Sequence, residues 1–160
     1  MILIGLGANL PGPWGKPSAA LARALARLDE LGVRVRARSR DFASAPVPPS
    51  DQPWFVNAVA ALDTALDPAS LLALLLRIET EGGRARGAAN AARSLDLDLL
   101  DYDGRISDGP PILPHPRMHE RAFVLAPLAE IAPEWRHPAL GLGARALLDS
   151  LGSGHAARPF

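Results

Sequence analysis

The chain has 160 residues, 48% of them hydrophobic, which suits one domain built around a single core. Lys and Arg total 17 and so do Asp and Glu, so the formal net charge is zero and a general attraction to nucleic acid is not expected. The absence of cysteine excludes disulfides, thiolate metal sites and a cysteine nucleophile. The apolar runs fall far short of the roughly 20 residues that cross a bilayer, and the N-terminus resembles a strand more than a signal peptide, so we expect a cytoplasmic protein without membrane partners.

The first 53 residues alternate extended and helical patterns. Residues 2–8 are apolar and β-favouring, residues 17–31 carry apolar side chains at helical spacing, and residues 33–40 alternate between small or apolar residues and arginines. We expect a strand, a helix and a second strand whose arginine face is solvated. The Pro-rich residues 44–53 follow. Prolines cannot pair in the centre of a sheet, so this stiff connection is a candidate binding rim.

A third strand and a second helix are predicted next. Residues 54–62 alternate as a strand does, with Phe55 and Asn57 on one face. Asn57 is a lone amide in an apolar run, and a buried amide needs partners, which are either protein groups or a ligand. Asp67 precedes a proline and a leucine-rich segment, which predicts a capped helix that ends at Gly82.

An acidic strand follows a basic loop. Residues 83–93 are small and carry three arginines, Arg84, Arg86 and Arg93. Strand side chains alternate between faces, so Asp96 and Asp98 are expected on one face and the neighbouring leucines on the other. Taken alone, the motif suits either a solvated edge strand or a divalent metal site. Because cations that suit phosphate lie beside carboxylates that suit a metal, the combination predicts a metal and phosphate site.

The last third of the chain is predicted to form a turn and two helices that are added to the strands and helices before it. His115 lies in a rigid proline turn, a short helix is expected to begin at Pro127, and an amphipathic helix is expected over residues 142–151. Residues 152–160 are expected to form a loose tail. The element order predicts an α+β fold in one domain, residues 1–160, with a ferredoxin-like βαββαβ core and a mainly antiparallel sheet with helices packed on it, plus C-terminal additions.

Five segments resemble, in order, those of the 6-hydroxymethyl-7,8-dihydropterin pyrophosphokinase (HPPK) family. They are Gly7-Ala8-Asn9-Leu10, Asp51-Gln52-Pro53-Trp54-Phe55-Val56-Asn57, Arg77-Ile78-Glu79, Arg93-Ser94-Leu95-Asp96-Leu97-Asp98 and Pro114-His115-Pro116-Arg117-Met118-His119-Glu120-Arg121-Ala122-Phe123. The last two are highly specific. One departure is Asn90-Ala91-Ala92, where many relatives carry an aromatic residue followed by Gly-Pro, so the basic loop is expected to close differently.

The resemblance implies a transferase that passes pyrophosphate from ATP to 6-hydroxymethyl-7,8-dihydropterin, giving AMP and a pterin diphosphate in folate biosynthesis. It implies two Mg²⁺ ions held by Asp96 and Asp98, with Arg84 and Arg93 also catalytic. The ATP-binding residues that it implies are Glu79, Arg84, Arg93, His115 and Arg121. The pterin-binding residues are Ser44, Pro46, Val47, Phe55, Asn57 and Phe123, and Arg86 belongs to a lid over the site.

Two other classes of function stay open. A two-metal nucleotidyltransferase also uses an Asp-x-Asp strand, but its glycine-rich turn should shortly precede the aspartates, whereas Gly5 and Gly7 are far away in the chain. A ferredoxin-like metabolite-binding module would keep the pocket without turnover. The products formed from ATP separate the three classes. In each case we expect a monomer.

Overall fold

The computed structural model describes residues 1–84, 92–152 and 157–160. Its elements, in chain order, are β1 (Ile2–Ala8), α1 (Pro17–Glu30), β2 (Arg34–Arg38), β3 (Phe42–Ser44), β4 (Phe55–Asp63), α2 (Pro68–Glu81), β5 (Asp96–Tyr102), β6 (Ser107–Asp108), β7 (Ile112–Leu113), the 3₁₀ turn η1 (Met118–Glu120), α3 (Ala122–Ile131), α4 (Ala144–Leu151) and β8 (Ala157–Pro159). Within these ranges the helices are all too short or too polar to span a membrane.

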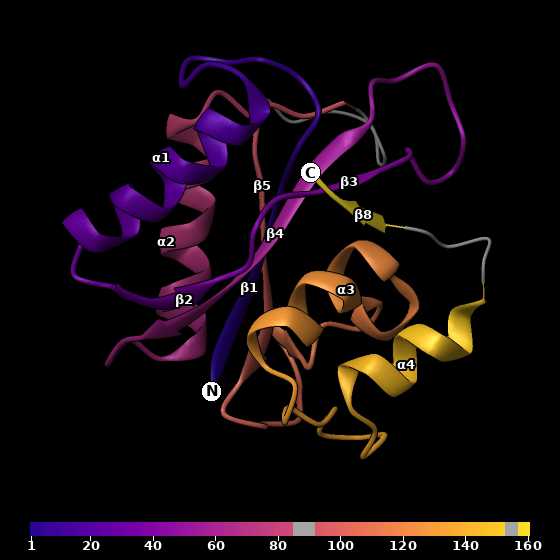
Figure 1. Ribbon diagram of the computed structural model, residues 1–160. Coiled ribbons are helices and arrows are strands. Elements are labelled where there is room, and N and C mark those ends of the chain that lie inside the picture. Colours follow the sequence, from indigo (N-terminus) through magenta and orange to yellow (C-terminus); the bar gives the residue numbers. More distant parts are fainter. Residues whose placement is uncertain (85–91, 153–156) are drawn as a thin grey trace.

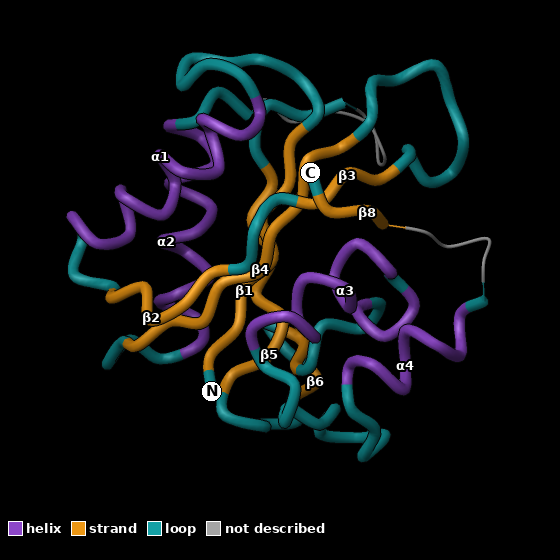
Figure 2. The backbone as a smooth tube through the Cα atoms, in the orientation of Figure 1, coloured by secondary structure: helices purple, strands orange, loops and turns teal. Residues whose placement is uncertain are grey.

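One antiparallel sheet organises the fold (Figure 2). The strand order is β5-β1-β4-β3-β8, and β2 pairs with the far half of β4. The nine-residue strand β4 is long enough to pair with β3 near Phe55 and with β2 near Asp63. The expected antiparallel sheet with packed helices is confirmed, and β1 lies between β4 and the edge strand β5.

Helices cover both faces of the sheet, α1 and α2 on one face and α3 and α4 on the other (Figure 1). Leu21 of α1 and Leu75 of α2 join Ile4 in one buried cluster, whereas Leu125 of α3 joins Val59 in the other. Each cluster removes apolar surface from water, at about 25 cal/mol per Å². Since both faces are covered, β4 is buried along most of its length.

The two core helices begin where the sequence predicts. The Asp67 side chain accepts a hydrogen bond from Ser70 N at 2.7 Å, and Pro68 is the first residue of α2. That bond to the backbone lowers the pKa of the Asp67 carboxyl. Pro17 likewise begins α1, since proline at the first helical position loses no hydrogen bond.

Two expectations for the C-terminal part are wrong. Helix α3 begins at Ala122, and Pro127 lies inside it. Proline interrupts one helical hydrogen bond, but Val124, Leu125 and Leu128 are buried, and their packing maintains the helix across it. Within the expected loose tail, residues 157–159 form β8, which pairs with β3.

Candidate active site

A cavity of about 580 Å³ opens at one end of the sheet, between the loop that follows β3, the strands β1, β4 and β5, and the start of α3. It brings together many of the residues predicted for the site. Those that line it are Ser44, Pro46, Val47, Phe55, Asn57, Arg93, Asp96, Asp98, Arg121 and Phe123. The remaining predicted residues Glu79, Arg84 and His115 are not part of this lining, and Arg86 lies outside the described residues, as do Asn90 and Ala91.

Glycines of β1 form part of the cavity floor. Gly7 pairs with Asp96 of β5 on one side and with Asn57 of β4 on the other, and Gly5 pairs with Asp98. A Cβ atom at residue 7 would lie 3.2 Å from Asn57 Oδ1, which is tight. The glycines therefore leave the space above β1 open between the carboxylates and the amide. Sequence reasoning did not assign them to the site, although a glycine inside a strand often marks such a close approach.

The acidic pair faces three arginines. Arg84 Nη1 lies 2.6 Å from Asp96 Oδ1, and Arg93 Nη1 lies 3.0 Å from Asp96 Oδ2. Arg121 Nη1 is more distant from Asp98 Oδ2, at 3.8 Å. Burial, together with the adjacent Asp96 carboxylate, raises the pKa of Asp98 to about 6. Asp98 is therefore the less well compensated of the two charges.

Glu79 holds Arg84 and the edge of β5 in place. Its carboxylate is buried on α2, and Oε2 accepts hydrogen bonds from Arg84 Nη1 at 2.7 Å and from Leu97 N at 2.6 Å. Burial raises the pKa of Glu79 to about 7 even though both bonds favour the charged form. Glu79 thus reaches the site through Arg84, which bridges it to Asp96.

At the other end of the cavity, polar and aromatic side chains are combined. Asn57 Nδ2 donates a hydrogen bond of 2.7 Å to Ser44 Oγ, and both residues are buried. Phe55 of β4 and Phe123 of α3 line the same space. The Arg121 guanidinium lies over the Phe123 ring, 5.5 Å from its centroid, so one arginine lies close to both an aromatic ring and Asp98.

Asn9 links Arg93 to the Pro-rich segment that precedes β4. Its Oδ1 accepts a hydrogen bond from Arg93 N at 2.8 Å, and its Nδ2 donates to Gln52 Oε1 and to Pro53 O, each at 3.1 Å. Asn9 is buried, and its own backbone N donates to Arg93 O. Sequence reasoning quoted this residue only as part of a motif. Its structural role is to fix Arg93 relative to the Pro-rich loop.

His115 is held as a neutral imidazole. Its Nδ1 accepts a hydrogen bond from Arg117 N at 3.1 Å, which places the proton of the neutral ring on Nε2. Burial and the nearby Arg121 charge lower the pKa of His115 to about 4. The ring can therefore act as a neutral hydrogen-bond donor at physiological pH.

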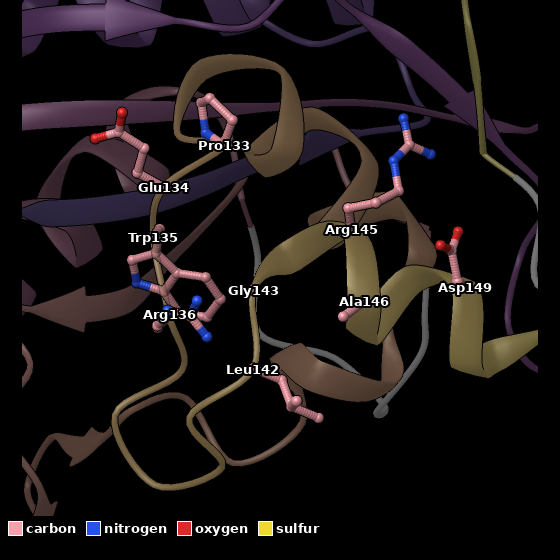
Figure 3. Close-up of a pocket in the computed structure, with 9 residues that line it drawn as sticks. All are labelled: Pro133, Glu134, Trp135, Arg136, Leu142, Gly143, Arg145, Ala146 and Asp149. Atoms are coloured by element: carbon pink, nitrogen blue, oxygen red, sulfur yellow. The ribbon is translucent and has the colours of Figure 1, made fainter.

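A second hollow, of about 410 Å³, lies beside α4 (Figure 3). Its lining carries charges of both signs and contains none of the predicted site residues; the charged members are Glu134, Arg136, Arg145 and Asp149. Because those charges are mixed, the hollow has no focused set of donors or acceptors for one charged ligand. The first cavity is the better candidate for chemistry.

The residues that fit a divalent metal are Asp96 and Asp98. They lie two residues apart on one strand and both line the cavity, and their mutual repulsion would be relieved by a cation. In the described part of the chain no group of three or more acidic, His or Cys side chains is arranged to hold an ion. Two carboxylates suit Mg²⁺, which usually takes its other ligands from substrate phosphates and water.

Together, the fold and the cavity define an α+β protein in which an acidic strand and arginines face one cavity. A sequence model of the 7,8-dihydro-6-hydroxymethylpterin-pyrophosphokinase (HPPK) family matches residues 3–133. The chain belongs to this family and is a pyrophosphokinase.

Two relatives document the similarity in sequence. The 2-amino-4-hydroxy-6-hydroxymethyldihydropteridine pyrophosphokinase of Methylorubrum extorquens is 46% identical over 133 residues, covering 82% of this chain and 82% of that protein. The Pseudomonas aeruginosa protein of the same name is 46% identical over 138 residues, covering 86% of this chain and 83% of that protein.

The fold recurs in solved structures of longer chains. A crystal structure of HPPK-DHPS in complex with substrates aligns with 93% of this chain at a TM-score of 0.68 and 13% identity. The Plasmodium falciparum HPPK-DHPS structure with pteroate gives the same TM-score and identity. This chain spans 43% and 42% of those two chains, so they document the shared fold.

Proposed function

We propose that the cavity lined by Asp96 and Asp98 is the active site in which this chain transfers pyrophosphate from ATP to the hydroxymethyl group of 6-hydroxymethyl-7,8-dihydropterin. The products are AMP and the pterin diphosphate of folate biosynthesis. One observation carries the proposal: the acidic pair and the aromatic residues Phe55 and Phe123 line the same cavity. Carboxylates suit metal-bound phosphates and aromatic rings suit a flat heterocycle, so both substrates can meet there.

Arginines and a histidine serve the phosphate end in this proposal. Arg84, Arg93 and Arg121 are paired with carboxylates in the structure, and the same guanidinium groups can bind phosphate oxygens once ATP arrives. The neutral His115 ring adds a donor at Nε2. Positive donors aimed at the phosphates stabilise the charge that spreads over the transferred group and the leaving AMP.

Asp96 and Asp98 would hold two Mg²⁺ ions. The bound ions would neutralise phosphate charge and orient the phosphates for attack by the pterin hydroxyl. In that state the carboxylates no longer need arginine counter-ions. Arg84 and Arg93 would then be free to bind the phosphates, and the ion pair with Glu79 would keep Arg84 within reach.

The other end of the cavity would bind the pterin. Phe55 and Phe123 offer ring faces, and the Asn57 amide offers a donor and an acceptor to the heterocycle edge. The hydrogen bond from Asn57 to Ser44 restricts the rotation of that amide. Pro46 and Val47 add a stiff apolar rim.

Three further statements belong to the proposal. Residues 1–160 form one domain, since the sheet contains strands from the first residues of the chain and from the last. The protein acts as a monomer in this proposal, since the residues of a single chain suffice to bring the acidic pair and the aromatic rings into one cavity. Its place is the cytoplasm, which agrees with a sequence free of cysteine.

Product analysis tests the proposal. The full chain is incubated with ATP, Mg²⁺ and 6-hydroxymethyl-7,8-dihydropterin, and nucleotides and pterins are separated by chromatography. We expect AMP and pterin diphosphate in equal amounts, and no turnover when EDTA replaces Mg²⁺. Release of inorganic pyrophosphate with AMP joined to the pterin would indicate a nucleotidyltransferase. Binding of both ligands without turnover would indicate a metabolite-binding module.

A further inference from the structure

Helix α4 reaches the cavity from outside the region that matches the family. The family match ends at residue 133, and α4 begins at Ala144. Leu151, the last residue of α4, lines the cavity and packs against the same core cluster as Phe123. An aliphatic side chain beside an aromatic wall extends the apolar surface available to a flat ligand.

Strand β8 is connected to the cavity through β3, with which it pairs and whose last residue, Ser44, lines the cavity. Ala157, Arg158 and Pro159 pair with Ser44, Ala43 and Phe42 of β3, respectively. Phe160 N donates to Asp41 O at 3.0 Å, and hydrogen-bonded pairs alternate along an antiparallel ladder, so the next such pair joins Arg158 to Ala43. Pro159 then falls at the position where a missing N–H costs no ladder bond.

The β8 pairing bears directly on Ser44. Strand β3 has only three residues, and β8 supplies its second neighbour in the sheet. Ser44 ends β3, is buried, and accepts the hydrogen bond from Asn57. A short strand with one neighbour frays easily, so the β8 pairing restricts the position of Ser44 and, through it, that of the Asn57 amide.

We propose that α4 and β8 together complete the pterin-binding end of the site, Leu151 as an apolar wall and β8 as a brace that positions Ser44 and Asn57. The inference rests on the proposed function. It concerns pterin affinity alone, because the arginines of the phosphate end contact other residues, Arg84 through Glu79, Arg93 through Asn9 and Arg121 through Asp98.

Leu151→Ala tests the wall. We expect the dissociation constant for the pterin, measured by calorimetry in the presence of an unreactive ATP analogue, to rise about five- to tenfold because ring contact area is lost. The ATP-analogue affinity should stay within about twofold. Leu148→Ala is the matched control. It truncates a partly buried leucine of the same helix that packs on the same cluster but is not part of the cavity lining.

Arg158→Pro tests the brace. It removes the N–H of the hydrogen-bonded ladder pair, whereas the control Arg158→Ala keeps that N–H and removes the side chain. We expect about a fivefold weaker pterin affinity in Arg158→Pro and unaltered affinity in Arg158→Ala.

Unaltered pterin affinity in Leu151→Ala would contradict the role of Leu151 as an apolar wall. Unaltered affinity in Arg158→Pro would contradict the role of β8 in positioning Ser44 and Asn57. Equal weakening in a variant and its control would overturn the corresponding part as well, because the effect would then be general destabilisation. Product formation by the unaltered chain is scored separately and reports on the proposed function. The ratio of affinities between each variant and its control decides this inference.

Discussion

At the scale of single residues, the acidic pair differs in how its charges are compensated. Asp96 has two arginine partners within 3.0 Å, whereas Arg121, the arginine that pairs with Asp98, is 3.8 Å away. A partly buried carboxylate that lies beside another carboxylate and far from its arginine partner is costly to ionise, which is why the pKa of Asp98 is raised. Residues that serve a ligand often cost stability when the ligand is absent.

Asp98→Asn should therefore stabilise the metal-free protein at neutral pH. The pKa of Asp98 is about 6 in the folded state, against 3.8 for the unperturbed group. The ionised side chain thus opposes folding above pH 6, and this cost disappears as the pH falls towards 4. Because its side chain is 32% exposed, we expect a gain of about 1 kcal/mol rather than the full effect of the shift.

Urea unfolding in EDTA at pH 7.5 and at pH 4 measures this difference. The variant should be the more stable protein at pH 7.5, and the two proteins should converge at pH 4. A difference that does not change with pH would show that the ionisation of Asp98 does not oppose folding.

Residue types alone predicted part of this site. Asp96 and Asp98 could be predicted because two carboxylates on one strand face demand a cation, and Asn57 because a lone amide demands partners. Gly7 and Asn9 could not be predicted in the same way. Their roles depend on which strands and loops meet in three dimensions, since Gly7 matters through its cross-strand neighbours and Asn9 through contacts with Gln52 and Arg93.

At the scale of elements, strand β5 carries carboxylates with two different roles: two line the cavity and a third is buried in the core. Asp96 and Asp98 face the cavity, but the β1–β5 register shifts between Leu3 and Ile4, and this irregularity changes the alternation. Asp101 is buried instead beside Trp135, whose Nε1 donates to Asp101 Oδ2 at 2.7 Å. The third carboxylate of the strand therefore anchors the segment that follows α3.

Asp101→Asn should destabilise the fold without removing activity. Asp101 accepts hydrogen bonds from Trp135 Nε1 and from Gly104 N, one on each oxygen. An amide has one acceptor oxygen, so one of these donors would lose its partner at a cost of about 2 kcal/mol. Urea unfolding and the turnover number measure the two effects. Lost turnover with unchanged stability would contradict a purely structural role.

Element boundaries were predictable where local chemistry defines them. Asp67 and Pro68 begin α2 by capping, and the sequence shows both. The start of α3 depends instead on how Val124 and Leu128 pack against the sheet, so the proline rule was misleading there. The position of β8 depends on β3, from which it is separated by more than one hundred residues in the chain.

At the scale of the whole molecule, the two faces of the sheet differ in what covers them. The face under α1 and α2 is occupied by one large apolar cluster that includes Ile4 and Leu97. The other face is shared between the cluster under α3 and α4 and the cavity. The fold class could be predicted from the order of strands and helices, because covered antiparallel sheets have few alternatives. How the second face is divided depends on three-dimensional packing.

The central claim is that Asp96 and Asp98 hold the metal ions for pyrophosphoryl transfer. Its most direct test is the turnover number of Asp96→Asn and Asp98→Asn at saturating ATP, Mg²⁺ and pterin, with Asp101→Asn as the control from the same strand. We predict that each cavity variant loses turnover on the order of 100-fold while remaining folded, and that the control stays within about threefold of the unaltered chain. Full turnover by Asp96→Asn or by Asp98→Asn would contradict the account.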